Sequence, residues 1–308
     1  MSDSRTKRLI LTCAAGLSVL LVIIAGKSAS GKRMDKETES CPVPVNLNET
    51  LTNEMSDTSC LAGFDKIVKD YLTYWGIHGA SLSVMRNDSL LFAKGYGEAD
   101  TDKKMGPGNI LRMASVSKLV TAVGIMVLQE RGLLSIKDHV FGPDGILNDS
   151  AYVAAIKDTL YNRITVEDLL RHKGGFSKRG GDPMFSTRWI MMQNGWKDVP
   201  TQEQLMELQL KRRVKFVPGT AQEYSNFGYL ALSMVIEKVS GMDYETFMQE
   251  NVLRPIGCVD FHIAGNYYKH KLPNETRYYV QHDDEPAEEF NNSGRKVIRC
   301  YGGNNVAG

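Results

Sequence analysis

One serine and one lysine in this sequence have the spacing and the setting that nucleophilic catalysis requires. Ser115 and Lys118 open an apolar run in the stretch MASVSKLVTA. Residues three apart share one face of a helix, so the hydroxyl and the amine can touch. A hydroxyl at a helix start also meets backbone N–H groups and the positive end of the helix dipole, which favour an oxyanion. The pair therefore predicts a serine nucleophile with a lysine base.

Lys118 is an unusual residue for the first turn of an apolar helix. Its cation opposes the helix dipole and is costly to desolvate. Both effects favour the neutral amine, which beside a serine hydroxyl is a general base. In the alternative interpretation Ser115 only caps the helix, and Lys118 extends along its stem to water. The Ser-x-x-Lys pattern alone does not decide, since it also occurs at 4–7 and 293–296.

A second motif lies about a hundred residues further on. Tyr224-Ser225-Asn226 is the only Tyr-x-Asn of the chain and stands in KFVPGTAQEYSNFGYLALSMVIEKVSG, residues 215–241. A Pro-Gly turn precedes the motif and an apolar helical pattern follows it. Taken alone, the motif is also compatible with a turn that contains a packed tyrosine and an asparagine stabilising its own loop.

Four segments in order resemble the serine β-lactamase-related family, which holds class C β-lactamases, D-Ala-D-Ala carboxypeptidases, related esterases and animal lactamase-like proteins. They are SVSK (115–118), ITVEDLLRHKGGF (164–176), FVPGT with YSNFGY (216–229) and IEKVSGMDYETFMQENVLRPIG (236–257). The resemblance covers the chain from about Leu61 to its last residue. It implies an α+β fold of the β-lactamase/transpeptidase type, with an antiparallel sheet flanked by helices, a helical region, and the site in the cleft between them.

The resemblance also implies a role for each motif residue. Ser115 is the acylated nucleophile and Lys118 its base. Tyr224 passes a proton to the leaving group, and Asn226 holds the amide or ester of the substrate. The implied function is a serine hydrolase that acts through an acyl-enzyme on a small amide, ester or peptide substrate, without metal or cofactor. The alternative is a non-catalytic ectodomain that uses the fold for binding or assembly.

The family's third motif, Lys-Thr-Gly or His-x-Gly on a strand after the tyrosine motif, is missing from this sequence. His172-Lys173-Gly174 has suitable letters but precedes Tyr224, so we interpret it as structural. In the family that strand lends one of two oxyanion donors, and losing one such donor typically costs ~10²–10³ in rate. We therefore expect the C-terminal strands of the domain to be incomplete and the activity of this chain to be impaired, as in a fragment, a short isoform or a pseudoenzyme.

Hydrophobic spacing predicts the elements that must position these residues. A helix is expected over 61–75, with Gly76 ending it, and a hairpin over 80–96 around the polar turn 86–89. The run over 116–130 is apolar almost all round, which predicts a fully buried helix ended by Gly132. Three further helices are expected at 166–171, 229–239 and 244–253. Gly241 ends the second of these and Pro255 the third.

Composition bounds the remaining possibilities. The chain has 308 residues, 42% of them apolar, and a formal net charge of +1. This length accommodates one large domain or two small ones. A nearly neutral chain has no large field of one sign, so nucleic acid is not favoured as a partner. The oligomeric state cannot be read from these features.

The N-terminal sequence predicts a membrane anchor. Residues 9–26, LILTCAAGLSVLLVIIAG, carry no charge, and as a helix they would rise about 1.5 Å per residue and nearly cross a hydrocarbon core of about 30 Å. Basic residues before it favour a cytoplasmic tail at 1–8. A flexible stalk at 27–60 and the domain at 61–308 would then be extracellular or lumenal. The alternative is a cleaved signal peptide and secretion.

Two further features favour a secretory route. Five N-glycosylation sequons begin at Asn48, Asn87, Asn148, Asn274 and Asn291. Outside the apolar segment stand four cysteines, an even number compatible with two disulfides of open connectivity. They are Cys41, Cys60, Cys258 and Cys300.

Overall fold

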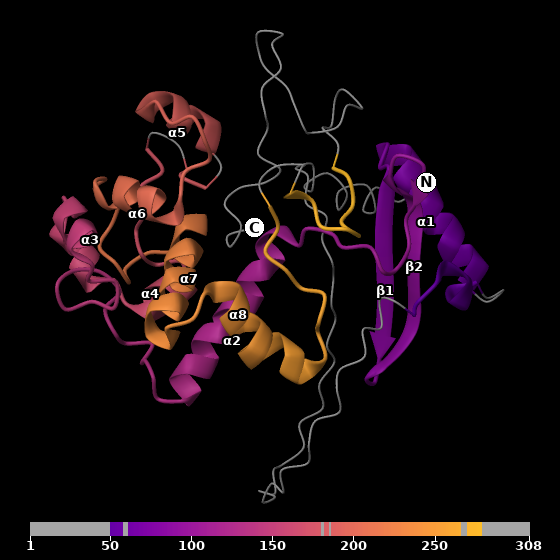
Figure 1. Cartoon of the computed structure of the whole chain (residues 1–308), viewed down its shortest axis with the longest axis horizontal. Coiled ribbons are helices and arrows are strands. Elements are labelled where there is room, and N and C mark those ends of the chain that lie inside the picture. The colour runs from indigo at the N-terminus through magenta and orange to yellow at the C-terminus, as the bar shows by residue number, and fades with distance from the viewer. Residues whose placement is uncertain (1–49, 58–60, 180–181, 185, 266–269, 279–308) are drawn as a thin grey trace, which may run out of the picture. The chain divides into compact units, whose positions relative to one another are not determined.

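A short antiparallel sheet with one helix on it comes first along the chain, and a group of packed helices follows (Figure 1). The computed structural model describes residues 50–57, 61–179, 182–184, 186–265 and 270–278. The helices and helical turns are η3 (Asn53–Ser56), α1 (Ala62–Trp75), η5 (Ala114–Val116), α2 (Ser117–Glu130), α3 (Ser150–Ala155), η6 (Thr159–Arg163), α4 (Val166–Leu170), α5 (Thr187–Asn194), α6 (Gln202–Leu210), α7 (Asn226–Ser240), α8 (Tyr244–Met248), η7 (Gln249–Leu253) and η8 (Arg254–Ile256).

The predicted hairpin is confirmed. Strand β1 (Gly79–Arg86) pairs antiparallel with β2 (Ser89–Asp100), and the short strand β3 (Lys103–Lys104) pairs with the far end of β2. Asn87 and Asp88 join β1 to β2 with φ angles of 49° and 58°. Two left-handed residues make a type I′ turn, whose twist matches that of the strands, and asparagine and aspartate tolerate this conformation best after glycine.

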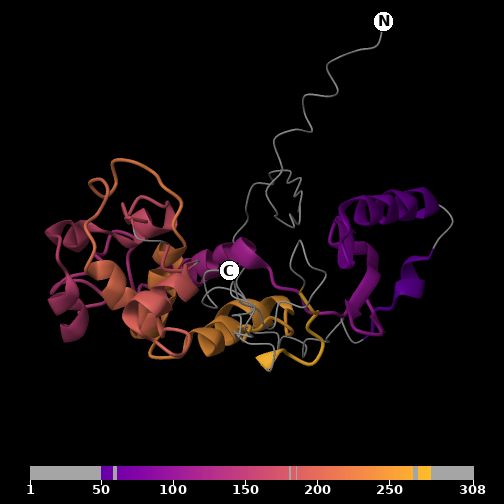
Figure 2. The ribbon, with the colours of Figure 1, turned by 90° about the horizontal axis from the view of Figure 1, so that it is seen from above.

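Helix α1 lies along one face of the hairpin, as both views show (Figures 1 and 2). It ends at Gly76, which has a φ of 60°, as the sequence predicts. One side of α1 packs with Phe92 and Tyr96 of β2 in a small apolar cluster. Four other large side chains of α1 are exposed, namely Ile67, Tyr71, Tyr74 and Trp75. Only some of the apolar residues that recur at helical spacing in α1 are therefore buried.

The folded part begins before Leu61. The Ser56 hydroxyl donates to the carbonyl of Ala93 and accepts from its N–H, both at 2.9 Å. Lys94 of β2 forms ion pairs with Asp57, which follows η3, and with Asp65 of α1. The sequence analysis predicts a flexible stalk up to residue 60. This boundary is wrong for residues 50–57, because the polar side chains of Ser56 and Asp57 bind this segment to β2.

Helix α7 is the centre of the main apolar core. Its residues from Asn226 to Ile236 are all buried, and it contacts α2, α4 and α8. It begins three residues before the predicted Tyr229 because Ser225 caps it, accepting the N–H of Gly228 at 3.1 Å. Gly241 ends the helix with a φ of 69°, as predicted.

Helix α2 differs from its prediction of complete burial. Ile125 and Leu128 are fully buried toward α7 and α8, whereas Leu119, Val123 and Met126 are 70%, 49% and 45% exposed. The elements that α2 contacts most are α7, η7, η5 and α8. An apolar helix is buried only as far as its neighbours reach, and hydrophobicity alone does not report how many it has.

The other predicted helices form with altered ends. The predicted 166–171 helix corresponds to α4. Over 244–253, α8 continues into the π-helical turn η7, and Pro255 does not end the run but stands in the first turn of η8, where a proline's missing N–H is not needed. Gly257, with a φ of 80°, ends it. Helices α3, α5 and α6 were not predicted.

Several sequence predictions fall on residues that the structure does not describe. The apolar segment 9–26, Asn48, Asn291 and the cysteines Cys41, Cys60 and Cys300 are among them. Cys258 is exposed and forms no disulfide with any described residue. The side chains of Asn87, Asn148 and Asn274 are exposed. Within the described ranges, no helix combines the length and apolar character needed to cross a bilayer.

Candidate active site

Ser115 lies in the 3₁₀ turn η5, immediately before α2. It is not the helix cap of the alternative interpretation, because the N-cap residue of α2 is Val116, which makes no side-chain capping bond. A capping serine would accept a backbone N–H of the first turn. The Ser115 Oγ instead accepts hydrogen bonds from two side chains, those of Lys118 and Tyr224.

The predicted contact between Lys118 and Ser115 is present. The Lys118 Nζ donates to the Ser115 Oγ at 3.2 Å, and Lys118 is only 5% exposed. The alternative in which this lysine extends to water is therefore wrong. Its ammonium group lies 5.1 Å from the ring centroid of Tyr224 and 5.7 Å from that of Tyr229, distances at which an aromatic face attracts a cation.

Tyr224 reaches the same serine from a distant part of the chain. Its hydroxyl donates to the Ser115 Oγ at 2.6 Å across 109 residues of sequence. Tyr224 is 44% exposed, so the oxygen atom between it and Lys118 faces an accessible side of the protein. The structure thus brings together three of the four motif residues, with one oxygen atom held between two proton donors.

The backbone before the nucleophile is strained. Ala114 has a φ of 46°, in the left-handed region. A residue with a Cβ pays of order 1–3 kcal/mol there and remains only where its surroundings hold it. Such strain is concentrated at functional sites, and here it directs the chain from the loop 106–113 into the turn that carries Ser115.

A buried ion pair holds that loop from the other end of the chain. The Arg112 Nε lies 3.0 Å from the Glu275 Oε1, and the guanidinium also donates to the carbonyl of Gly265 at 2.6 Å. The Arg112 N–H donates to the hydroxyl of Tyr278 at 2.7 Å. Glu275 is 2% exposed. The segment 270–278 therefore positions the residues that lead into Ser115.

Asn226, the fourth motif residue, lies at the start of α7. It is 4% exposed, and its Oδ1 is buried without a hydrogen-bond partner among the described residues. A buried amide oxygen in this state is costly unless something binds it. Asn226 is the first residue of α7. Its contact with substrate stays a prediction.

Sequence reasoning missed the part that His172 plays in the geometry. Its ring centroid lies 4.6 Å from that of Tyr224 and 5.2 Å from that of Tyr229. Burial lowers the pKa of His172, and the nearby charge of Lys118 lowers it further. The segment 164–176 that carries His172 is part of the family resemblance, but its proximity to Tyr224 is a tertiary contact that no local pattern indicates.

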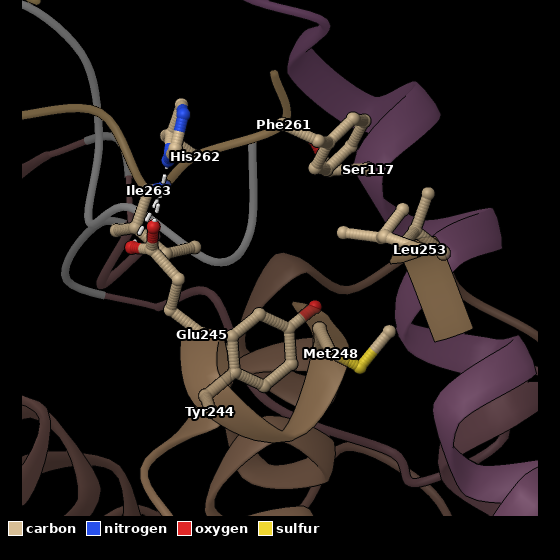
Figure 3. A pocket seen from close by; sticks show the side chains of 9 residues that line it. Ser117, Tyr244, Glu245, Met248, Leu253, Phe261, His262 and Ile263 are labelled. Atoms are coloured by element: carbon tan, nitrogen blue, oxygen red, sulfur yellow. Dashed lines mark hydrogen bonds and ion pairs between the residues drawn. The ribbon is translucent and has the colours of Figure 1, made fainter. Parts of the chain in front are cut away.

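A cavity of about 40 Å³ lies next to α2 and α8, and none of the four motif residues lines it. Figure 3 shows the Glu245 carboxylate directed toward His262, whose Nδ1 lies 3.0 Å from the Glu245 Oε1. Tyr244 lines the same cavity, and burial raises its pKa to about 12. Within the described ranges, no three histidine, cysteine or acidic side chains form a group that could hold a metal ion.

Comparison with known proteins gives a consistent result. The Beta-lactamase family model matches residues 64–303. A penicillin-binding protein of Bacillus subtilis (strain 168) is 25% identical over 188 residues, which are 60% of this chain and 37% of that protein. A putative D-alanyl-D-alanine carboxypeptidase of Escherichia coli O157:H7 is 23% identical over 252 residues, which are 77% of this chain and 53% of that protein. The chain thus spans about half or less of each relative's length.

Among solved structures, the D-amino acid amidase of Ochrobactrum anthropi SV3 in complex with L-phenylalanine amide has a similar fold. The TM-score is 0.55 at 21% sequence identity, with 72% of this chain and 58% of that chain covered. At this level of identity the likeness concerns the fold, an α+β arrangement of antiparallel sheet and helices.

Proposed function

Because the chain belongs to the Beta-lactamase family, we propose that it is a serine hydrolase that forms an acyl-enzyme on Ser115. The observation that carries the proposal is the position of the Ser115 Oγ, 3.2 Å from the Lys118 Nζ and 2.6 Å from the Tyr224 hydroxyl. A nucleophile within hydrogen-bond reach of a base, with a second proton carrier on the same oxygen, is the arrangement that acyl transfer needs.

The proposed reaction assigns each proton. Lys118 reacts in its deprotonated form: the Ser115 hydroxyl gives its proton to this amine while the serine oxygen forms a bond to the substrate carbonyl carbon. The carbonyl π electrons move to oxygen, and the tetrahedral intermediate collapses as the bond to the leaving amine or alkoxide breaks. Tyr224 donates a proton to that leaving group and recovers one from Lys118. Water then hydrolyses the ester on Ser115 by the same steps in reverse.

Asn226 supplies a binding role in this proposal. This role is the one that the family resemblance implies, and the position of Asn226 two residues after Tyr224 is suited to holding the substrate close to the proton carrier. The substrate class is a small amide, ester or peptide. Two similar proteins support it by name, one a putative D-alanyl-D-alanine carboxypeptidase and the other a D-amino acid amidase.

A fluorophosphonate probe tests the nucleophile directly. We expect the full chain to be labelled on Ser115, and Ser115→Ala to abolish the labelling. Ser117→Ala is the matched control, because Ser117 is two residues after Ser115 but lines the separate cavity, and it should be labelled like the unaltered protein. We expect slow labelling, since no Lys-Thr-Gly or His-x-Gly motif follows Tyr224 in the sequence.

The same experiment decides between this proposal and a non-catalytic ectodomain. Labelling that persists in Ser115→Ala, or no labelling of the unaltered chain after prolonged incubation, would favour the binding or assembly role. Slow labelling confined to Ser115 would support an impaired hydrolase.

The location of the protein is part of the proposal. We propose that residues 9–26 anchor the chain in a membrane, with the domain on the extracellular or lumenal side. The exposed side chains of Asn87, Asn148 and Asn274 are compatible with glycosylation there. Treatment with a peptide N-glycosidase should lower the mass of protein from a eukaryotic secretory host, and alkaline extraction should leave it in the membrane. Release by alkali would indicate the cleaved signal peptide instead.

A further inference from the structure

His172 occupies a backbone position that histidine seldom takes. It follows the C-cap residue of α4 and has a φ of 57°. Its N–H donates to the carbonyl of Leu169 at 3.1 Å. Glycine is the usual residue at such a helix end, and a side chain there costs free energy. This backbone conformation directs attention to what the imidazole contacts.

The backbone on both sides of Tyr224 is bound to His172. The Glu223 N–H donates to the main-chain carbonyl of His172 at 2.9 Å. The Ser225 N–H donates to the His172 Nδ1 at 3.3 Å. His172, which follows the end of α4, thus holds the residues directly before and directly after Tyr224.

The imidazole also supports the phenol ring. Its plane is tilted by 41° to that of Tyr224, with the centroids 4.6 Å apart. The ring centroid of Tyr229 also lies 5.2 Å from that of His172, and the Tyr229 hydroxyl donates to the carbonyl of Leu170 at 3.2 Å. The imidazole thus lies against both tyrosine rings, so a displacement of His172 would move Tyr224.

We propose that His172, in its neutral form with the proton on Nε2, is a positioning residue that holds the Tyr224 hydroxyl on the Ser115 Oγ. The neutral tautomer is required because a protonated Nδ1 is a donor and cannot accept the Ser225 N–H. The effect on rate rests on the proposed hydrolase function, whereas the coupling between the two rings does not.

The charges around His172 support the neutral form. Lys118 of α2 and Lys178 beyond α4 are the charged groups that act on it, and both lower its pKa in addition to burial. Tyr224 and Tyr229 face it with their aromatic rings. As the pH falls through the lowered pKa, the ring gains a proton, loses the Ser225 bond and places a second cation near Lys118. The site should therefore lose its geometry on the acid side only.

Nuclear magnetic resonance on the full chain in detergent tests the coupling without any activity. With ¹⁵N-histidine and ¹³Cζ-tyrosine labels, we expect the His172 Nδ1 to be unprotonated at pH 7.5 and the ring to titrate below the ordinary histidine range. The Tyr224 signal, assigned by its loss in Tyr224→Phe, should shift with the same midpoint. His262→Asn is the matched control, because His262 pairs with Glu245 at the separate cavity, and it should leave this titration unchanged.

Two substitutions separate the hydrogen bond from the ring. His172→Asn keeps an acceptor and tolerates a left-handed backbone, so hydrolysis of methyl butyrate should stay within about threefold and lose its acid limb at that midpoint. His172→Phe keeps a ring without an acceptor and should hydrolyse methyl butyrate about tenfold more slowly, as expected when one orienting hydrogen bond is lost.

Two results would overturn the inference. One is a Tyr224 signal that does not follow the titration of His172, and the other is the same acid limb in His172→Asn as in the unaltered protein. If no form of the chain hydrolyses an ester, the proposed function fails, but the resonance titration still decides whether His172 positions Tyr224.

Discussion

At the scale of single residues, the Ser115 oxygen is held by two side chains with different tasks. Lys118 is buried and belongs to the first turn of α2, whereas Tyr224 is partly exposed and precedes α7. A buried amine suits the removal of the serine proton, and an accessible phenol suits a leaving group that departs toward solvent.

A change of leaving group distinguishes these tasks. Tyr224→Phe removes the hydroxyl, so an ester whose alkoxide needs a proton should react about 100-fold more slowly. We expect methyl butyrate hydrolysis to show this loss and 4-nitrophenyl butyrate hydrolysis to be much less affected, because nitrophenolate leaves without a proton. Tyr74→Phe, on the exposed side of α1, is the control. Equal losses with both esters would mean that Tyr224 does not protonate the leaving group.

At the scale of elements, α2 is positioned by a close approach at one glycine. A Cβ added at Gly124 would lie 2.6 Å from the Met248 Sδ and 3.1 Å from the Ile236 Cδ1. The absence of a side chain at this position lets α2 lie directly on α7 and the end of α8. The register of Ser115 and Lys118 against Tyr224 depends on this packing, since all of them are on or next to these helices.

Gly124→Val should therefore lower the free energy of unfolding by roughly 1–3 kcal/mol through overpacking. The matched variant is Gly63→Val in α1, where an added Cβ would meet nothing within 4 Å, and this change should be nearly neutral because valine and glycine are both weak helix formers. Urea unfolding of the two variants measures the difference. Equal stabilities would contradict the close packing of α2.

At the scale of the whole molecule, the segment 270–278 holds the end of β2 and the loop 106–113 that leads to Ser115. Asp100 at the end of β2 pairs with Lys271 at 2.9 Å, and the N–H of Ile110 donates to the carbonyl of Asn274 at 2.8 Å. With the Arg112–Glu275 pair, these contacts connect the end of the sheet, the loop before Ser115 and residues 270–278.

Glu275→Gln should release this connection. It removes the charge that compensates Arg112 in a buried setting, which typically costs about 3 kcal/mol or more. We expect faster hydrogen exchange in 106–113 and 270–278 as well as lower stability. Asp70→Asn is the control, because Asp70 forms an exposed pair with Lys66 on α1, and such pairs contribute about 1 kcal/mol or less. Unchanged exchange in Glu275→Gln would show that the ion pair does not hold the loop.

Local patterns predicted the elements well where the cause of the element is local. The hairpin follows from β-rich runs around Asn87-Asp88, and the ends of α1 and α7 follow from Gly76 and Gly241. They predicted poorly where burial decides, as in the exposed Leu119, Val123 and Met126 of α2. Helix α6 has weak apolar periodicity and was not predicted.

The sequence by itself indicated which groups can react, because Ser115 and Lys118 stand three residues apart where an apolar helix begins, and the order of four motifs indicates the family. Only the tertiary structure decided that Ser115 is not a cap, that Lys118 is buried, and that His172 lies against Tyr224. These facts depend on contacts between residues from about 50 to more than 100 positions apart. Such contacts arise from the packing of α2, α4 and α7, which no local pattern encodes.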